Sequence, residues 1–179
     1  MLNRDNAILV VVDVQGKLAQ LMFEKSALFK GLYQAVAGCR ILDVPVLWLE
    51  QLPDKLGSTI PEVADQLPDL QPIAKSSFGC MGSIEFREAL YASGRKHIIL
   101  CGIETHICVY QSAMQLLEAG YEVTILEDAT SSRTPENRSL GVRKMISKGV
   151  SPSSVEMLLF ELMGDATDPD FREVALLIK

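Results

Sequence analysis

Short apolar runs alternate along the chain with longer amphipathic stretches. The run Ala7–Val12 is continuous and β-branched, which is typical of a strand buried on both faces. The same kind of pattern predicts further strands at 44–49, 96–100 and 121–126, and shorter ones at 72–75 and around 154–158. Apolar residues at helical spacing predict helices over 28–42, 83–93, 108–119, 135–148 and 170–178.

Residues at the ends of these stretches support the assignments. Gly94 and Gly120 follow two of the helices, where a C-terminal glycine cap is expected, and Pro135 stands where a helix can begin. Strands that alternate with helices favour an α/β fold, with a parallel sheet covered on both faces. We expect residues 1–179 to form one domain. Such sheets bind ligands beyond the carboxyl ends of their strands.

Charge and hydropathy exclude several classes of partner. The 179 residues carry a net charge of -6, without the clustered Lys and Arg on which nucleic-acid binding depends. The longest apolar run, Ala7–Val12, is far shorter than the ~20 residues that span a bilayer. No basic block suited to a membrane surface and no signal peptide is visible. We therefore expect a cytoplasmic protein that acts on a small molecule, without nucleic-acid or membrane partners.

Cysteine and histidine usage narrows the chemistry. The four cysteines, Cys39, Cys80, Cys101 and Cys108, include no CxxC pair, so we expect free thiols. The two histidines, His97 and His106, leave little room for a histidine-rich metal site. We expect no metal and no cofactor.

Asp13 is the first candidate for chemistry, because it directly follows the strand Ala7–Val12. A carboxylate at this edge of the sheet, partly removed from water, would have a raised pKa and could accept a proton. Asp is also common at strand ends as a turn or cap residue, and the position alone does not separate the two interpretations.

Cys108 is the second candidate, because it falls near the start of the helix that follows the strand 96–100. Unpaired N–H groups at a helix N-terminus favour a thiolate and could hold an oxyanion. A buried structural cysteine is the alternative. Cys80 is the one rival nucleophile, and Cys101 fits a structural role. Activation of Cys108 by His106 is disfavoured, because residues two apart do not face each other on a helix.

Lys75 is the third candidate, at the end of a short strand. There it could lower the pKa of a thiol and stabilise developing negative charge, although most lysines are solvated surface residues. His97 begins its strand and is expected at the opposite end of the sheet, which leaves Asp13 as the better base.

Together, these residues resemble the isochorismatase-like cysteine hydrolase superfamily over nearly the whole chain. The pieces that carry the resemblance are Ile8–Gln15 (ILVVVDVQ), Lys75–Phe78 (KSSF), Gly102–Val109 (GIETHICV), Leu116–Val123 (LLEAGYEV), Asp128–Arg133 (DATSSR) and Ser154–Glu156 (SVE). Each motif is modestly specific alone, and their order and joint presence make the resemblance strong.

The resemblance implies a three-layer, Rossmann-like α/β/α fold with a six-stranded parallel sheet of order 3-2-1-4-5-6. It implies a triad of Asp13, Lys75 and Cys108. It also implies a cis peptide between Ile103 and Glu104, and an oxyanion site formed by the backbone N–H groups of Glu104 and Cys108. Relatives form homo-oligomers, so a dimer, tetramer or octamer is expected.

The same resemblance favours a metal-free branch that includes YcaC-like and isochorismatase-domain-containing proteins. Nicotinamidases carry an Asp-x-His pair after the second strand, whereas this chain has Leu49–Asp54 (LEQLPD) without histidine. The implied activity is hydrolysis of a small amide, carbamoyl or related C–N bond through a cysteine thioester. The expected substrate pocket contains Gln15, Leu18, Gln51, Phe78, His106 and Ile107.

Three other interpretations stay open. One is a binding or scaffold protein that retains the fold, and another is an isochorismate-type vinyl ether hydrolase. The third is a thiol-redox protein that pairs Cys80 or Cys101 with Cys108, which the absence of CxxC disfavours. Apolar residues in 18–23 and 157–160 are candidates for an oligomer interface, and core packing would explain them equally well.

Overall fold

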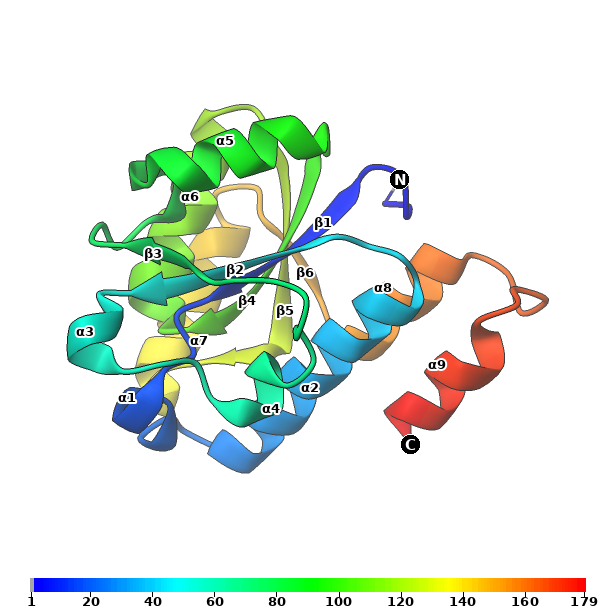
Figure 1. The fold of residues 1–179 in the computed structure, drawn as a ribbon, viewed down its shortest axis with the longest axis horizontal. Helices are drawn as coiled ribbons and strands as arrows, with labels where there is room; N and C mark the ends of the chain where they lie inside the picture. The colour runs from blue at the N-terminus through cyan, green and yellow to red at the C-terminus, as the bar shows by residue number, and fades with distance from the viewer. Residues whose placement is uncertain (1) are drawn as a thin grey trace.

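The computed structural model describes residues 2–179 and contains a six-stranded parallel sheet of order β3-β2-β1-β4-β5-β6 (Figure 1). All five strand pairings are parallel, and helices cover both faces of the sheet, so the expected α/β/α architecture and strand order are confirmed. The strands are β1 Ala7–Val12, β2 Val46–Gln51, β3 Ile73–Lys75, β4 His97–Ile103, β5 Glu122–Ser131 and β6 Ser151–Ser153.

The predicted helices are present, with ends that differ by a few residues, as α2 Lys25–Ile41, α5 Ile84–Ser93, α6 Tyr110–Glu118, α7 Pro135–Ile146 and α9 Phe171–Ile178. A further long helix, α8 Val155–Met163, was not predicted. The short helices α1 Gly16–Gln20, α3 Pro53–Leu56 and α4 Pro61–Ala64 lie in the loops that follow β1 and β2. They were not predicted, because four or five residues are too few to show a helical repeat of apolar positions. Gly94 ends α5 in the left-handed conformation, and the Thr134 side chain caps α7, as the boundary residues predict.

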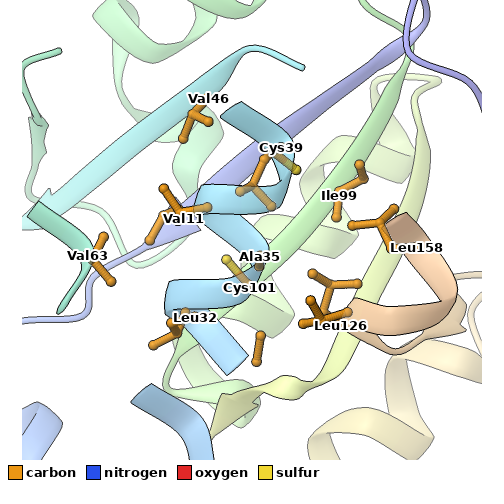
Figure 2. Packing of buried hydrophobic residues seen from close by; sticks show 14 of the residues in the cluster. Val11, Leu32, Ala35, Cys39, Val46, Val63, Ile99, Cys101, Leu126 and Leu158 are labelled. Atoms are coloured by element: carbon orange, nitrogen blue, oxygen red, sulfur yellow. The ribbon is translucent and has the colours of Figure 1, made fainter. Parts of the chain in front are cut away.

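Strand β1 shows why the central strands are apolar without alternation. Leu9 and Val11 point into the core under α2 and α8, whereas Ile8 and Val10 point into the core on the other face. Figure 2 shows the first of these cores, where Val11 and Ile99 of the sheet lie against Leu32 and Leu158 of the helices. Both faces of β1 are sealed from water, which leaves its ends as the places where a polar side chain can act.

The strand expected around 154–158 is wrong, because these residues begin helix α8. The Ser154 side chain caps this helix by accepting a hydrogen bond from the N–H of Met157 at 3.2 Å. Val155, Leu158 and Leu159 then follow at helical spacing, and all three are buried. The true edge strand β6 lies just before, in the polar sequence Ser151–Ser153, which has no apolar pattern to reveal it. Among residues 2–179, no helix is both long and apolar enough to cross a membrane.

Candidate active site

The register of the sheet brings the three candidate residues to one edge. Val12, the last residue of β1, pairs with Leu49 of β2 and with Gly102 of β4. Gln51, two residues further along β2, pairs with Lys75 of β3. Asp13 therefore emerges between the ends of β2 and β4, with the end of β3 beyond β2. A Cβ atom at Gly102 would lie 2.1 Å from the carbonyl oxygen of Val12, so glycine is required for this close approach.

Lys75 and Asp13 form an ion pair that is almost completely enclosed. Lys75 Nζ lies 2.6 Å from Asp13 Oδ2, and the two side chains are 0% and 3% exposed. The ammonium also donates to Gln51 Oε1 at 2.7 Å and to the carbonyl oxygens of Ser77 at 3.1 Å and Phe78 at 3.0 Å. A buried ion pair is stable only when such further hydrogen bonds satisfy the charged groups. Asp13 Oδ1, by contrast, is buried without a hydrogen-bond partner among the described residues.

Cys108 lies in a π-helical turn, Thr105–Val109, that leads from β4 into α6. The carbonyl oxygen of Glu104 accepts from the N–H groups of Ile107 at 3.0 Å and Val109 at 3.2 Å, which fixes the turn. Cys108 is 9% exposed and belongs to the same buried cluster as Val12 and Leu100. It faces Asp13 closely enough for each group to shift the pKa of the other.

The resting protonation state differs from the thiolate that the helix start predicts. Burial and then the negative charge of Asp13 raise the pKa of Cys108 to about 12, against the weaker opposing effect of Lys75. Burial likewise raises the pKa of Asp13, and this outweighs the lowering effect of Lys75. The raised pKa favours the protonated thiol of Cys108 at neutral pH, and the carboxylate of Asp13 is the charged group that faces it.

The peptide bond between Ile103 and Glu104 is cis. The Glu104 backbone acts to lower the pKa of Cys108. The buried Glu104 carboxylate accepts from the N–H of Arg133 at 3.1 Å and from Arg133 Nε at 3.2 Å. Arg133 was not among the expected site residues. Its only signal in the sequence is its place at the end of Asp128–Arg133, a segment that carries the family resemblance but shows no partner for it.

The two glutamines expected in the pocket lie next to the Lys75–Asp13 ion pair, on the side of Lys75. Gln15 is fully buried, and its side-chain amide hydrogen-bonds to Gln51 and Gly57 backbone groups. Gln51 is also buried and bonds to Lys75 through its side-chain oxygen. Gln51 therefore contacts Lys75 directly, and Gln15 contacts the backbone of Gln51.

The other expected pocket residues surround the site less closely. Phe78 is 55% exposed, although its carbonyl oxygen binds Lys75. His106 is half-buried and its Nδ1 lies 2.9 Å from Ser132 Oγ, whereas Leu18 and Ile107 pack against opposite cores. A cavity of about 350 Å³ between Leu52 and Ser76 touches Lys75, and another of about 300 Å³ between α2 and β5 is lined by none of the triad.

All four cysteines are free, as expected, and all four are buried. Cys39 and Cys101 belong to the core under α2, on the opposite face of the sheet from Cys108, whereas Cys80 shares the core of Cys108. Burial raises the pKa of Cys80 to about 12. His97 lies at the amino end of β4, as expected, with Nε2 2.7 Å from Thr124 Oγ1. Among residues 2–179, no three His, Cys, Asp or Glu side chains are grouped to hold a metal ion.

Comparison with known proteins places these features in a family. Residues 7–157 match the model of the isochorismatase domain. The chain belongs to the isochorismatase family. The secreted isochorismatase effector Isc1 of Phytophthora sojae is 35% identical over 178 residues, covering 97% of this chain and 85% of the relative. Isochorismatase domain-containing protein 2 of Bos taurus is 32% identical, covering 97% and 83%.

Solved structures of this family have the same fold. The MAR1 ribonuclease of Caenorhabditis elegans superimposes with a TM-score of 0.92 and 32% identity, covering 99% of this chain and 91% of its own. The YcaC gene product of Escherichia coli, described as an octameric hydrolase of unknown specificity, has a TM-score of 0.93 and 23% identity, covering 99% and 88%. Membership of the family suggests a hydrolase, and the predicted resemblance to it is confirmed.

Proposed function

We propose that the chain is a cysteine hydrolase that cleaves a small amide, carbamoyl or related C–N bond through a thioester on Cys108. The observation that carries this proposal is the enclosed Lys75–Asp13 ion pair facing a buried thiol. Burial raises the pKa of Asp13 and so makes it a stronger base than an exposed carboxylate, and its Oδ1 has no hydrogen-bond partner among the described residues. A buried charge pair is costly to build, so a purely structural purpose is a poor explanation for it.

In the first half-reaction, Asp13 takes the thiol proton while the sulfur of Cys108 forms a bond to the carbonyl carbon. The ammonium of Lys75 offsets the negative charge that moves between the two groups. The oxyanion accepts hydrogen bonds from the backbone N–H groups of Glu104 and Cys108, each typically worth ~3 kcal/mol. The C–N bond then breaks, and the proton held by Asp13 leaves with the ammonia or amine.

In the second half-reaction, water attacks the thioester carbonyl carbon. Asp13, again a carboxylate, accepts a proton from this water. The C–S bond breaks, the acid product leaves, and the proton returns to the sulfur of Cys108. The cycle needs no group beyond the substrate, water and these side chains.

The test is ammonia release from a panel of small amides and carbamoyl compounds, with Cys108→Ala compared with Cys101→Ala. Both variants remove one buried thiol, but Cys101 lies on the other face of the sheet. We expect Cys108→Ala to abolish turnover and acyl-enzyme mass, while Cys101→Ala retains both. Turnover that survives in Cys108→Ala would contradict the thioester mechanism.

The name of one structural neighbour, a ribonuclease, supplies a second candidate function. The net charge of -6 gives no electrostatic attraction for RNA, so we place this candidate below hydrolysis of a small molecule. Incubation of the purified protein with a labelled RNA decides between them. RNA cleavage that is lost in Cys108→Ala would replace our proposal, whereas cleavage that persists indicates a contaminating nuclease.

The family name supplies a third candidate, hydrolysis of an isochorismate-type vinyl ether. Pyruvate release from isochorismate is the assay for it, and we expect none from this chain. A protein that releases neither ammonia nor pyruvate, and whose Cys108 is not acylated by any amide in the panel, would instead fit a binding or scaffold role.

We also propose that the chain acts in the cytoplasm as a homo-oligomer. The octamer described for the YcaC gene product supports self-association, and Leu21 and Met157 leave large apolar side chains exposed. Light scattering should give a mass that is a multiple of 19.7 kDa, and Leu21→Lys or Met157→Lys should lower it if either residue lies in the interface. The Phytophthora sojae relative is named a secreted effector, so fractionation of the source cells tests the location.

A further inference from the structure

We infer that Gln51 is a positioning residue that holds the Lys75 ammonium against Asp13, and that Gln15 in turn fixes Gln51. The inference rests on the proposed function, because it assigns these glutamines to the support of the same triad. It gives them a role different from lining a substrate pocket.

The first step is the orientation of the Gln51 amide. Its Oε1 accepts from Lys75 Nζ at 2.7 Å, and its Nε2 donates to the carbonyl oxygen of Ser76 at 2.7 Å. Only one arrangement of the amide satisfies both contacts, with the oxygen toward the ammonium. Apart from Asp13, Gln51 is the one side chain among the described residues that accepts a hydrogen bond from Lys75.

The second step is the support of Gln51 by Gln15. Gln15 Oε1 accepts from the backbone N–H of Gln51 at 2.6 Å, and Gln15 Nε2 donates to the backbone carbonyl of Gln51 at 3.1 Å. These are the two backbone groups that a neighbouring strand would satisfy. Strand β1 ends at Val12, opposite Leu49, so the Gln15 side chain replaces the missing strand and holds Gln51 in place.

The third step is the number of hydrogen bonds. An ammonium has three N–H donors, and four oxygen atoms surround Lys75 Nζ within 3.1 Å. The four oxygen atoms therefore compete for three N–H donors, and the position of the ammonium depends on the strength of each acceptor. A change in the charge of one acceptor alters how strongly the ammonium acts on Asp13, and through Asp13 on Cys108.

The direction of this effect follows from the charges that face the two groups. Lys75 lowers the pKa of both Asp13 and Cys108, whereas Glu50 raises that of Asp13 and Asp13 raises that of Cys108. Gln51→Glu would place a carboxylate against Lys75 and draw the ammonium's charge away from Asp13. Both Asp13 and Cys108 would then ionise at higher pH.

The experiment is the pH dependence of Cys108 alkylation by iodoacetamide, followed by peptide mass mapping. The sulfur displaces iodide from the reagent and the thiol proton passes to Asp13 and solvent, so the reaction reports ionisation of Cys108 without any substrate. Gln34→Glu is the matched control, because Gln34 on α2 is also buried and donates its Nε2 to a backbone carbonyl, that of Leu177, at 2.8 Å. Thermal unfolding of each variant shows that it is folded.

At pH 8, well below the pKa of Cys108, we expect Gln51→Glu to slow alkylation of Cys108 about tenfold or more, because a charge within a few ångströms typically raises a pKa by about one unit or more. Gln34→Glu should leave the alkylation rate at the wild-type value. A profile for folded Gln51→Glu that coincides with wild type would overturn the inference. So would an equal shift in both variants.

If Gln51→Glu does not fold, Gln51→Met compared with Gln34→Met gives the same decision without an added charge. The loss of the amide oxygen should slow alkylation of Cys108 at pH 8 about tenfold, the size of one charge-assisted hydrogen bond. A rate within twofold of Gln34→Met would overturn the inference.

The outcome is separable from that of the proposed function. If no amide is hydrolysed but the profile of Gln51→Glu shifts, the positioning role stands and the proposed reaction fails. If hydrolysis depends on Cys108 but neither Gln51 variant changes alkylation, the reaction stands and the positioning role fails. Where turnover is found, the Gln51 variants should lower kcat and leave KM within twofold, because Gln51 contacts Lys75 and not the substrate.

Discussion

At the carboxyl end of the sheet an ammonium and a carboxylate are enclosed together, whereas at the amino end the charged groups stay partly in water. Lys75 and Asp13 are 0% and 3% exposed, while Arg4, which precedes β1, is 28% exposed where it pairs with Asp168 and Asp170. Both groups of charged residues lie at ends of the same sheet, so the composition of the strands does not explain why one group is enclosed and the other is partly exposed.

The difference is one reason why we propose the carboxyl end of the sheet as the site of chemistry. An ion pair that is partly in water contributes little to stability, because solvent screens it. An enclosed pair needs neighbours that satisfy every donor, and here Gln51 and the carbonyl oxygens of Ser77 and Phe78 do so. Burial raises the pKa of both Asp13 and Cys108 here, although Lys75 acts in the opposite direction, and our proposal uses these two groups for a proton transfer.

The largest effect is expected from Asp13→Asn. Asn accepts the left-handed backbone conformation of this position, where φ is 53°, but it cannot take a proton from Cys108. We expect kcat/KM for the amide identified by ammonia release to fall by roughly 10²–10⁴-fold. Circular dichroism confirms that the variant is folded, and a loss of less than tenfold would contradict the role of Asp13 as base.

Lys75→Met should have the next largest effect, on stability. It leaves the Asp13 carboxylate buried without its counter-charge, which typically lowers the free energy of unfolding by about 3–5 kcal/mol. Denaturant unfolding measures this loss. Lys96→Met is the control at the amino end, where Lys96 is exposed and its Nζ lies 5.6 Å from the Tyr121 ring centroid. Lys96→Met should lower the free energy of unfolding by less than about 1 kcal/mol. Equal losses in Lys75→Met and Lys96→Met would contradict the contrast between the two ends of the sheet.

A smaller effect is expected from Arg4→Gln. It breaks the ion pairs with Asp168 at 2.6 Å and Asp170 at 2.9 Å, each worth roughly 0.2–1 kcal/mol when partly exposed. The difference from wild type should shrink in 1 M salt, because the Debye length falls to about 3 Å. A difference that is unchanged by salt would mean that Arg4 stabilises the protein by packing.

The smallest effect concerns His97 at the amino end. Burial lowers its pKa, against the opposing charges of Glu122 and Glu161. The folded protein therefore keeps His97 neutral while the unfolded chain takes up a proton below about pH 6.5. Stability should fall as the pH drops from that value toward the folded pKa. His97→Gln should lose less stability over this interval in unfolding experiments, and parallel curves would show that His97 does not contribute.

The sequence was most informative where burial is complete. Ala7–Val12 is buried on both faces, so its apolar run identified β1 to the residue. The pattern was misleading at 154–158, where Val155, Leu158 and Leu159 are compatible with either structure until Ser154 is seen to cap a helix. The apolar pattern gave no indication of β6, because an exposed edge strand buries no face and so needs no hydrophobic residues.

The α/β fold, the family, the position of Asp13 and Lys75 at strand ends and that of Cys108 near a helix start could all be inferred from the sequence, since they follow from local patterning and motif order. The raised pKa of Cys108 could be found only from the three-dimensional structure, because it depends on burial and on the charge of Asp13, which lies 95 positions away in the chain. The three-dimensional structure likewise decided that Gln15 and Gln51 lie on the side of Lys75. These contacts arise from strand register, which brings distant residues together and which no local pattern records.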